Sequence, residues 1–157
     1  MKIRFTVIGK TSQDFIQKGI DEYCDRLKHY FPFELNVIPD IKNAKNLSFA
    51  QIKEKEGEIL LKSVVPEDFI VLLDEKGREF SSLKFADFLE KLKNSSSKRI
   101  IFVIGGAYGF SEKVYERANE KISLSKMTFS HQIVRLIFVE QLYRAATILN
   151  GEPYHHE

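Results

Sequence analysis

The run 98–109, with the sequence KRIIFVIGGAYG, constrains the fold more than any other stretch of the chain. Residues 100–104 are all apolar and mostly β-branched, a run that is too short for a buried helix and typical of a strand covered on both faces. The run stops at Gly105 and Gly106, and Ser111 then has the position of a helix N-cap. An α/β sheet places its ligand where a strand, a glycine loop and a helix follow in this order. The same order also makes a tight turn with no ligand.

Strand and helix patterns alternate along the whole chain. Strands are predicted over residues 3–9, 33–38, 69–73, 100–104 and 121–124, and helices over residues 14–30, 48–64, 82–93, 111–119 and 131–150. The polar run 74–77 is expected to be a turn that ends the third strand. The alternation favours an α/β fold, a mostly parallel sheet with helices on both faces. No internal repeat divides the chain, so we expect a single domain over 1–157.

The last predicted helix is apolar over most of its surface. Between residues 133 and 149 nearly every position is apolar, and the exceptions are Arg135, Glu140, Gln141, Arg144 and Thr147. A helix of this composition needs cover on most sides. An interface with a second subunit would supply that cover in a domain this small, and burial within one chain is the alternative.

Three segments follow the third, fourth and fifth predicted strands. They are residues 73–74, 105–109 and 124–129. The carboxyl ends of parallel strands meet at one edge of a sheet, so the three segments are expected to converge on one pocket.

Composition excludes several classes of protein. The net charge of +2 is too small to mark a nucleic-acid-binding surface by itself, and a single cysteine, Cys24, gives neither a disulfide framework nor a thiolate metal site. The four histidines lack metal-ligand spacing, and His155 lies in a terminal tail of a kind that is usually disordered. No apolar run is long enough to cross a membrane and the first residues lack the shape of a signal peptide, so a cytoplasmic protein without metal is expected.

The motifs in order identify a family. VIGGAYG, SLSKMTFSHQIVRLIFVEQLYRA and the terminal GEPYHHE closely resemble the RlmH family, and DEYCDRL, FELNVIPD, KEKEGE and IVLLDEKG fit as well. The likeness covers essentially the whole chain. The family belongs to the SPOUT superfamily of S-adenosylmethionine-dependent methyltransferases. It implies an α/β fold with a deep C-terminal trefoil knot, a homodimer, and methylation of N3 of a pseudouridine in helix 69 of 23S ribosomal RNA in the assembled ribosome.

The resemblance also implies which residues bind the cofactor. The positions that match are Leu73, Gly105, Leu124, Ser125, Lys126, Met127, Thr128 and Phe129. One departure concerns the residue before the last helix, where the family commonly has proline and this chain has Ser130. Proline suits a helix start by fixing φ, whereas serine can cap the helix through its hydroxyl. We expect a slightly less rigid loop with its function kept.

The chemistry of the implied reaction suggests further site residues. A pseudouridine ring that loses its N3 proton gains negative charge, and a fixed cation stabilises it. Arg135 is the first candidate for that cation, with His131 as a second catalytic candidate. Arg144, Tyr154 and His155 are candidates for substrate binding, with His131, Tyr154 and His155 closing over the substrate from the partner subunit. The alternative for either arginine is an ion pair with Glu140 at an interface.

Two other functions stay open at this point. One is a related knotted methyltransferase that acts on another RNA, such as tRNA. The other is a ribosome-binding or assembly factor that keeps the fold without catalysis.

Overall fold

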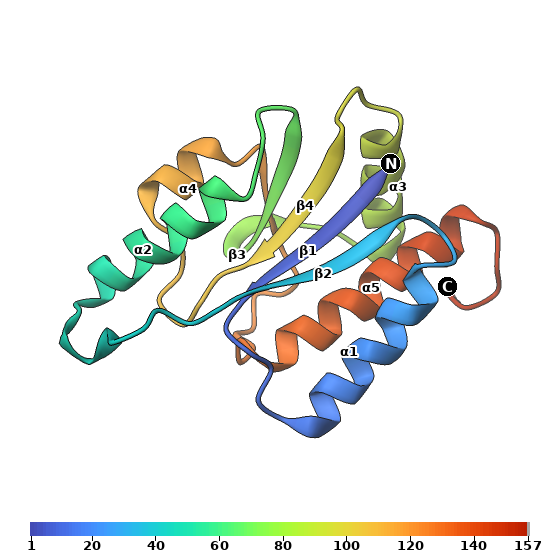
Figure 1. The fold of residues 1–157 in the computed structure, drawn as a ribbon. Coiled ribbons are helices and arrows are strands. Elements are labelled where there is room, and N and C mark those ends of the chain that lie inside the picture. Colours follow the sequence, from blue (N-terminus) through green and yellow to red (C-terminus); the bar gives the residue numbers. More distant parts are fainter. Residues whose placement is uncertain (157) are drawn as a thin grey trace.

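The computed structural model describes residues 1–156 as one parallel β-sheet with helices on both of its faces (Figure 1). Its elements in chain order are β1 (Lys2–Ile8), α1 (Asp14–Leu27), β2 (Phe33–Ile38), a 3₁₀ turn η1 (Ala44–Asn46), α2 (Phe49–Lys62), β3 (Asp68–Glu79), α3 (Ser82–Lys93), β4 (Arg99–Ile104), α4 (Glu112–Arg117), β5 (Glu120–Ser123) and α5 (Ile133–Leu149). The predicted α/β class is confirmed, and most predicted boundaries lie within three residues of these.

The strands are ordered β2-β1-β4-β3-β5, and every pairing between them is parallel. Helices α1, α3 and α5 pack on one face, where α5 lies between the other two. Helices α2 and α4 cover the other face (Figure 1). A parallel sheet brings all five carboxyl ends to one edge, so the connections that follow β3, β4 and β5 become neighbours there.

Strand β4 is the middle of the core, as its unbroken apolar run predicted. Phe102 packs with Phe5 of β1 and Phe138 of α5 on one face of the sheet. Ile101 and Val103 point into the second apolar cluster, beneath α2 and α4. Alternate side chains of a strand face opposite sides, so a strand covered on both faces must be apolar throughout.

The predicted turn over residues 74–77 is wrong, because β3 continues through it to Glu79. Leu73 pairs with Ile122 of β5, the register then shifts, and Arg78 pairs with the same residue. A side-chain carbon at Gly77 would lie 2.6 Å from the backbone of Ile122, so only glycine allows this approach. The polar residues form a bulge at the edge of the sheet, and that bulge is part of the site described below.

Among residues 1–156, no helix is both long enough and apolar enough to cross a membrane.

Candidate active site

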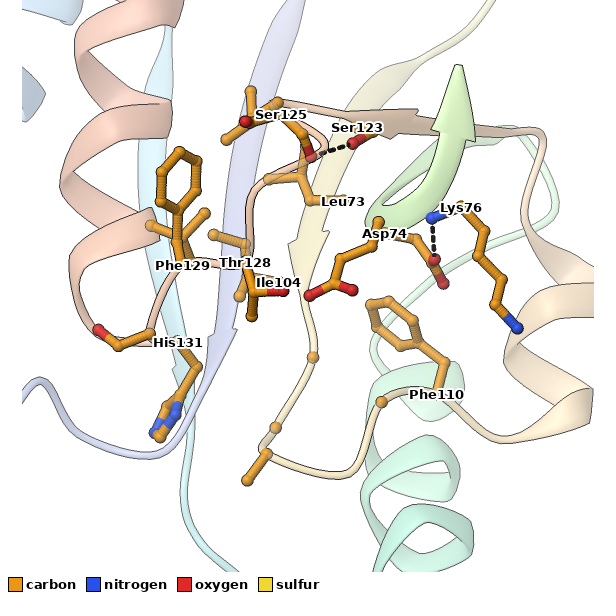
Figure 2. A pocket seen from close by; sticks show the side chains of 18 of the residues that line it. Leu73, Asp74, Lys76, Ile104, Phe110, Ser123, Ser125, Thr128, Phe129 and His131 are labelled. Carbon is orange, nitrogen blue, oxygen red and sulfur yellow. Dashed lines mark hydrogen bonds between the residues drawn. The ribbon is translucent and has the colours of Figure 1, made fainter. Parts of the chain in front are cut away.

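A cavity of about 470 Å³ opens where β4 and β5 end and where β3 begins its bulge. Ile104 and Ser123 end β4 and β5 on its wall, Leu73 lies at the start of the bulge, and Figure 2 shows the three side chains from close by. The three segments singled out in the sequence all contribute to the wall, so their predicted convergence is confirmed. A cavity of this size is in the usual range for a small organic ligand.

The glycine loop after β4 forms one wall as a four-residue turn. The N–H of Gly109 donates to the carbonyl of Gly106 (3.2 Å), and Gly109 has a φ of +84° that suits glycine. A side-chain carbon at Gly105 would lie 3.1 Å from the ring of Phe110, which also lines the cavity. The loop therefore presents backbone rather than side chains to the cavity.

The segment from β5 to α5 forms the opposite wall. The hydroxyl of Ser123 donates to the carbonyl of Ser125 (2.9 Å), whose own hydroxyl accepts from the N–H of Met127 (2.9 Å). The hydroxyl of Ser130 accepts from the N–H of Ile133 (3.2 Å) at the start of α5. Ser130, at the position where the resembled family commonly has proline, thus binds the N–H of the first residue of α5, although the N-cap position itself is Gln132, which makes no side-chain cap hydrogen bond.

The bulge of β3 brings a carboxylate to the cavity. Asp74 accepts the N–H of Lys76 (2.8 Å), as Figure 2 shows, and it also accepts the hydroxyl of Tyr115 from α4. Burial and the hydrogen bond to Asp74 raise the pKa of Tyr115 to about 12, so its hydroxyl stays protonated at neutral pH. This pair ties the bulge to α4 and fixes one acidic side chain on the wall.

Comparison with known proteins identifies the family. A family model described as "Predicted SPOUT methyltransferase" matches residues 1–155. The chain belongs to the SPOUT methyltransferase family. It is 64% identical over 157 residues to a protein of Parabacteroides distasonis named "Ribosomal RNA large subunit methyltransferase H", and 59% identical to one of the same name from Bacteroides thetaiotaomicron. Each alignment covers 100% of both chains.

The cavity contains most of the positions that the resemblance assigned to the cofactor of a SPOUT methyltransferase. Seven of the eight positions line it, namely Leu73, Gly105, Leu124, Ser125, Met127, Thr128 and Phe129. The eighth, Lys126, is not on the wall, and its ammonium group lies 3.9 Å from Glu79 on the surface. The structure thus brings seven of these residues together around one space and turns the lysine side chain away from it.

Arg135 does not line the cavity. Its guanidinium donates to the carbonyls of Ile8 (2.7 Å) and Gly9 (2.8 Å) and to the hydroxyl of Thr11 (3.0 Å), while Nε donates to the carbonyl of His131 (3.1 Å). The residue is only 1% exposed. These contacts fasten the end of β1 to the start of α5. Arg135 therefore has a structural role in this chain, and its role as the catalytic cation stays a prediction.

The two ends of α5 carry different candidate residues. His131 is exposed and lines the cavity beside the start of the helix (Figure 2). Arg144 forms an ion pair with Glu140 (2.5 Å), and its Nη1 lies 3.2 Å from Nδ1 of His155. Tyr154 donates to the same glutamate (2.9 Å) and lies beneath the guanidinium of Arg144. The described part of the tail is therefore packed rather than disordered, and the ion pair suggested as an alternative exists within one chain.

Several residues of the wall were not predicted from the sequence. Phe110 and Tyr115 come from the stretch after the glycine loop, and Val134 comes from the first turn of α5. The only feature of the sequence that could have indicated them is that they follow, within a few residues, the segments 105–109 and 124–129 that were predicted to form the pocket. Residues 1–156 contain no group of three or more His, Cys, Asp or Glu side chains that could hold a metal ion.

A buried carboxylate supports the glycine loop from behind. Glu56 of α2 is 6% exposed, and its Oε1 has no hydrogen-bond partner within residues 1–156. A side-chain carbon at Gly106 would lie 2.9 Å from both of its carboxylate oxygens. Burial, together with the charge of Asp40, raises the pKa of Glu56. The loop therefore rests on a group whose charged form is disfavoured.

Proposed function

We propose that this protein is an S-adenosylmethionine-dependent methyltransferase of large-subunit ribosomal RNA, which methylates N3 of a pseudouridine in helix 69 of 23S rRNA within the assembled ribosome. The observation that carries the proposal is the cavity, whose wall holds seven of the eight positions expected to bind the cofactor. The curated names of the full-length relatives support the RNA class. Because its substrate is the ribosome, we place the protein in the cytoplasm.

The chemistry of the cavity fits S-adenosylmethionine. Leu73, Leu124 and Met127 offer apolar surface for an adenine ring, and the glycine loop offers backbone donors and acceptors for its edge. Asp74 and Glu75 add carboxylates that favour a positively charged ligand. Bound S-adenosylmethionine supplies a methyl group that is already activated on a sulfonium, so the protein needs to provide orientation rather than covalent catalysis.

The residues expected to bind the substrate point to a homodimer. Val134 is the α5 residue on the cavity wall, and Arg144 lies ten residues later, which is about 15 Å along a helix. Tyr154 and His155 pack around Arg144, so within one chain this cluster is remote from the cavity. Two α5 helices packed antiparallel about a two-fold axis place the carboxyl end of one beside the amino end of the other. The partner subunit's Arg144 would then face the substrate.

Apolar side chains on α5 fit this arrangement. Those that remain partly exposed are Ile133, Val134, Leu136, Ile137, Tyr143, Ile148 and Leu149. Such a surface is expected to be covered in the assembled protein. We extend the proposal to the family's deep trefoil knot, in which the segment after β5 is threaded through a loop. Supporting it, Gln132 at the end of that segment accepts the N–H of Ser12 (2.9 Å), which follows β1 on the other side of the sheet centre.

The roles of the substrate-facing groups follow from the reaction. The ring gains negative charge as N3 loses its proton, and the guanidinium of the partner subunit's Arg144 would stabilise that charge. His131 lies on the wall, where its imidazole can form a hydrogen bond with the substrate ring. The partner subunit's Tyr154 would stack on a base, as aromatic rings do with unpaired RNA.

Calorimetric titration with S-adenosylmethionine tests the cofactor assignment. Thr128→Trp fills the cavity and is expected to weaken binding at least about tenfold through lost apolar and hydrogen-bonding contacts. Lys126→Trp is the matched control, because the same bulk two residues away points to solvent and leaves affinity unchanged. Unchanged affinity in Thr128→Trp would place the cofactor outside this cavity.

A further inference from the structure

Two aromatic rings stack on the surface behind the glycine loop. Phe49 at the start of α2 and Tyr108 in the loop have ring centres 4.0 Å apart and planes inclined by 17°. Phe49 is 63% exposed and Tyr108 is 42% exposed. The pair therefore presents a flat apolar face to water, although burying such rings would be favourable.

The stack is built into the turn that walls the cavity. Ala107 and Gly109 both line the cavity, and Tyr108 lies between them at the tip of the turn. Met127 stands on the other wall of the same cavity and is 76% exposed. Met127 on one wall and Tyr108 at the tip of the opposite turn thus place exposed apolar side chains on both sides of the cavity.

Positive charge accompanies the rings. Lys42 and Lys45 are exposed on the segment that leads into α2, and Lys53 follows Phe49 by one helical turn, on the hollow beside Gly109. No ion pair within residues 1–156 involves any of the three lysines. A flat aromatic face with unpaired cations around it is the combination that binds single-stranded nucleic acid, through base stacking and phosphate contacts.

We propose that the Phe49–Tyr108 stack is a platform for an unpaired base of the RNA substrate, next to the nucleotide that enters the cavity. The inference rests on the proposed function for its substrate. The platform holds the strand by ring stacking, and Lys45 and Lys53 contact the backbone phosphates on either side of the base. A base that stacks on Phe49, the more exposed of the two rings, extends the existing stack by one layer, and this requires no rearrangement of the loop.

The rival explanation is that the stack only braces the glycine loop against α2. The two roles differ in which binding affinity they affect. A brace stabilises the loop and therefore affects the affinity for S-adenosylmethionine, whereas a platform affects the RNA alone. An apolar contact with a ribosomal protein is a third possibility, and it would not require an aromatic ring.

Four variants separate these roles, measured by ribosome binding in sedimentation, by KM for ribosomes and by the dissociation constant for S-adenosylmethionine. Phe49→Ala and Phe49→Leu are expected to weaken ribosome binding and raise KM about tenfold with cofactor affinity unchanged, as loss of one base stack requires. Phe49→Trp keeps the stack and is expected to behave as the wild type. Ile59→Ala removes an exposed apolar side chain elsewhere on α2 and is the control with no effect.

Three results would overturn the platform. They are unchanged ribosome binding in Phe49→Ala, wild-type behaviour of Phe49→Leu, and a loss of cofactor affinity equal to the loss of ribosome affinity. Failure of the proposed function is a separate result, since a wild-type protein that transfers no methyl group can still show ribosome binding that depends on an aromatic ring at position 49.

Discussion

Replacing Arg135 with methionine separates structural support from catalysis. Methionine fills similar space but donates no hydrogen bond, so Arg135→Met removes the donors to Ile8, Gly9, Thr11 and His131 together. Four acceptors lose their partner in one step, and the three in and after β1 are buried. Within residues 1–156, the end of β1 and the start of α5 then keep only the hydrogen bonds of Gln132 with Ser12 and Lys10.

The size of the effect follows from those four bonds. A hydrogen bond to a charged group contributes about 1.5–3 kcal/mol. Replacing the arginine also removes the free-energy cost of burying its charge, and this offsets part of the loss. Hydrogen bonds from one group are not additive, so the net loss in free energy of unfolding is expected to be about 3–5 kcal/mol. Domains of this size unfold with about 5–15 kcal/mol, so Arg135→Met should be measurably unstable but folded in the cold.

Urea unfolding at a fixed protein concentration measures this loss, and Arg144→Met is the matched control. Its ion pair with Glu140 spans one turn of the same helix and contributes about 0.5 kcal/mol. We expect Arg135→Met to lose the stated free energy of unfolding, while kcat per folded molecule falls less than tenfold. A variant that loses under 1 kcal/mol while kcat falls more than tenfold would refute the reasoning and restore Arg135 as the catalytic cation.

Three further changes probe other parts of the account. Because burial raises the pKa of Glu56, folding favours its protonated form. The free energy of unfolding therefore falls as pH rises from the ordinary glutamate pKa through the raised one. In urea unfolding, Glu56→Gln should flatten this pH dependence and stabilise the protein at neutral pH. Gly77→Ala places a carbon 2.6 Å from the backbone of Ile122, and we expect a lower melting temperature with weaker binding of S-adenosylmethionine by calorimetry. Burial alone would raise the pKa of Asp68, but the hydrogen bonds from Arg99 and Val65 and the charges of Arg99 and Arg4 together outweigh burial and lower the pKa. The ionised carboxylate therefore stabilises the protein at neutral pH, and this contribution is lost as pH falls through the lowered pKa. Asp68→Asn should cost about 2–3 kcal/mol at neutral pH and little in acid.

Each of these three predictions has a result that contradicts it. A Glu56→Gln protein with the wild-type pH slope would mean that Glu56 is solvated. A Gly77→Ala protein with wild-type melting and cofactor affinity would mean that β3 does not approach β5 at this point. Equal destabilisation of Asp68→Asn at both pH values would mean that the pair with Arg99 does not set its ionisation.

Much of the fold could be predicted because local patterns and tertiary packing agree. The run 100–104 is apolar on both faces and became the central strand β4, buried on both sides. Ser111 and Ser130 have the spacing of helix caps, and both hydroxyls accept N–H groups at helix starts. In these stretches the sequence period and the burial favour the same element.

The errors come from contacts that no local pattern encodes. The polar residues 74–77 have the composition of a turn, but β5 pairs beside them and β3 continues, which only the close approach at Gly77 allows. Arg135 on an apolar helix suggests a functional charge, yet its partners are backbone carbonyls more than a hundred residues earlier in the chain. Arg135 stood out in the sequence as a charge on an apolar helix, whereas Gly77 did not, and no local pattern indicates what either residue contacts.

The most direct test of the central claim is transfer of labelled methyl from S-adenosylmethionine to ribosomes from a strain that lacks this protein. Assembled ribosomes, free large-subunit RNA and tRNA are compared, and the modified nucleoside is identified by mass. The account predicts label on N3 of a pseudouridine in 23S rRNA, in assembled ribosomes only. Label on tRNA would assign a different substrate to the same cavity. Cofactor binding without transfer to any of the three would contradict the account and leave a ribosome-binding factor with this fold.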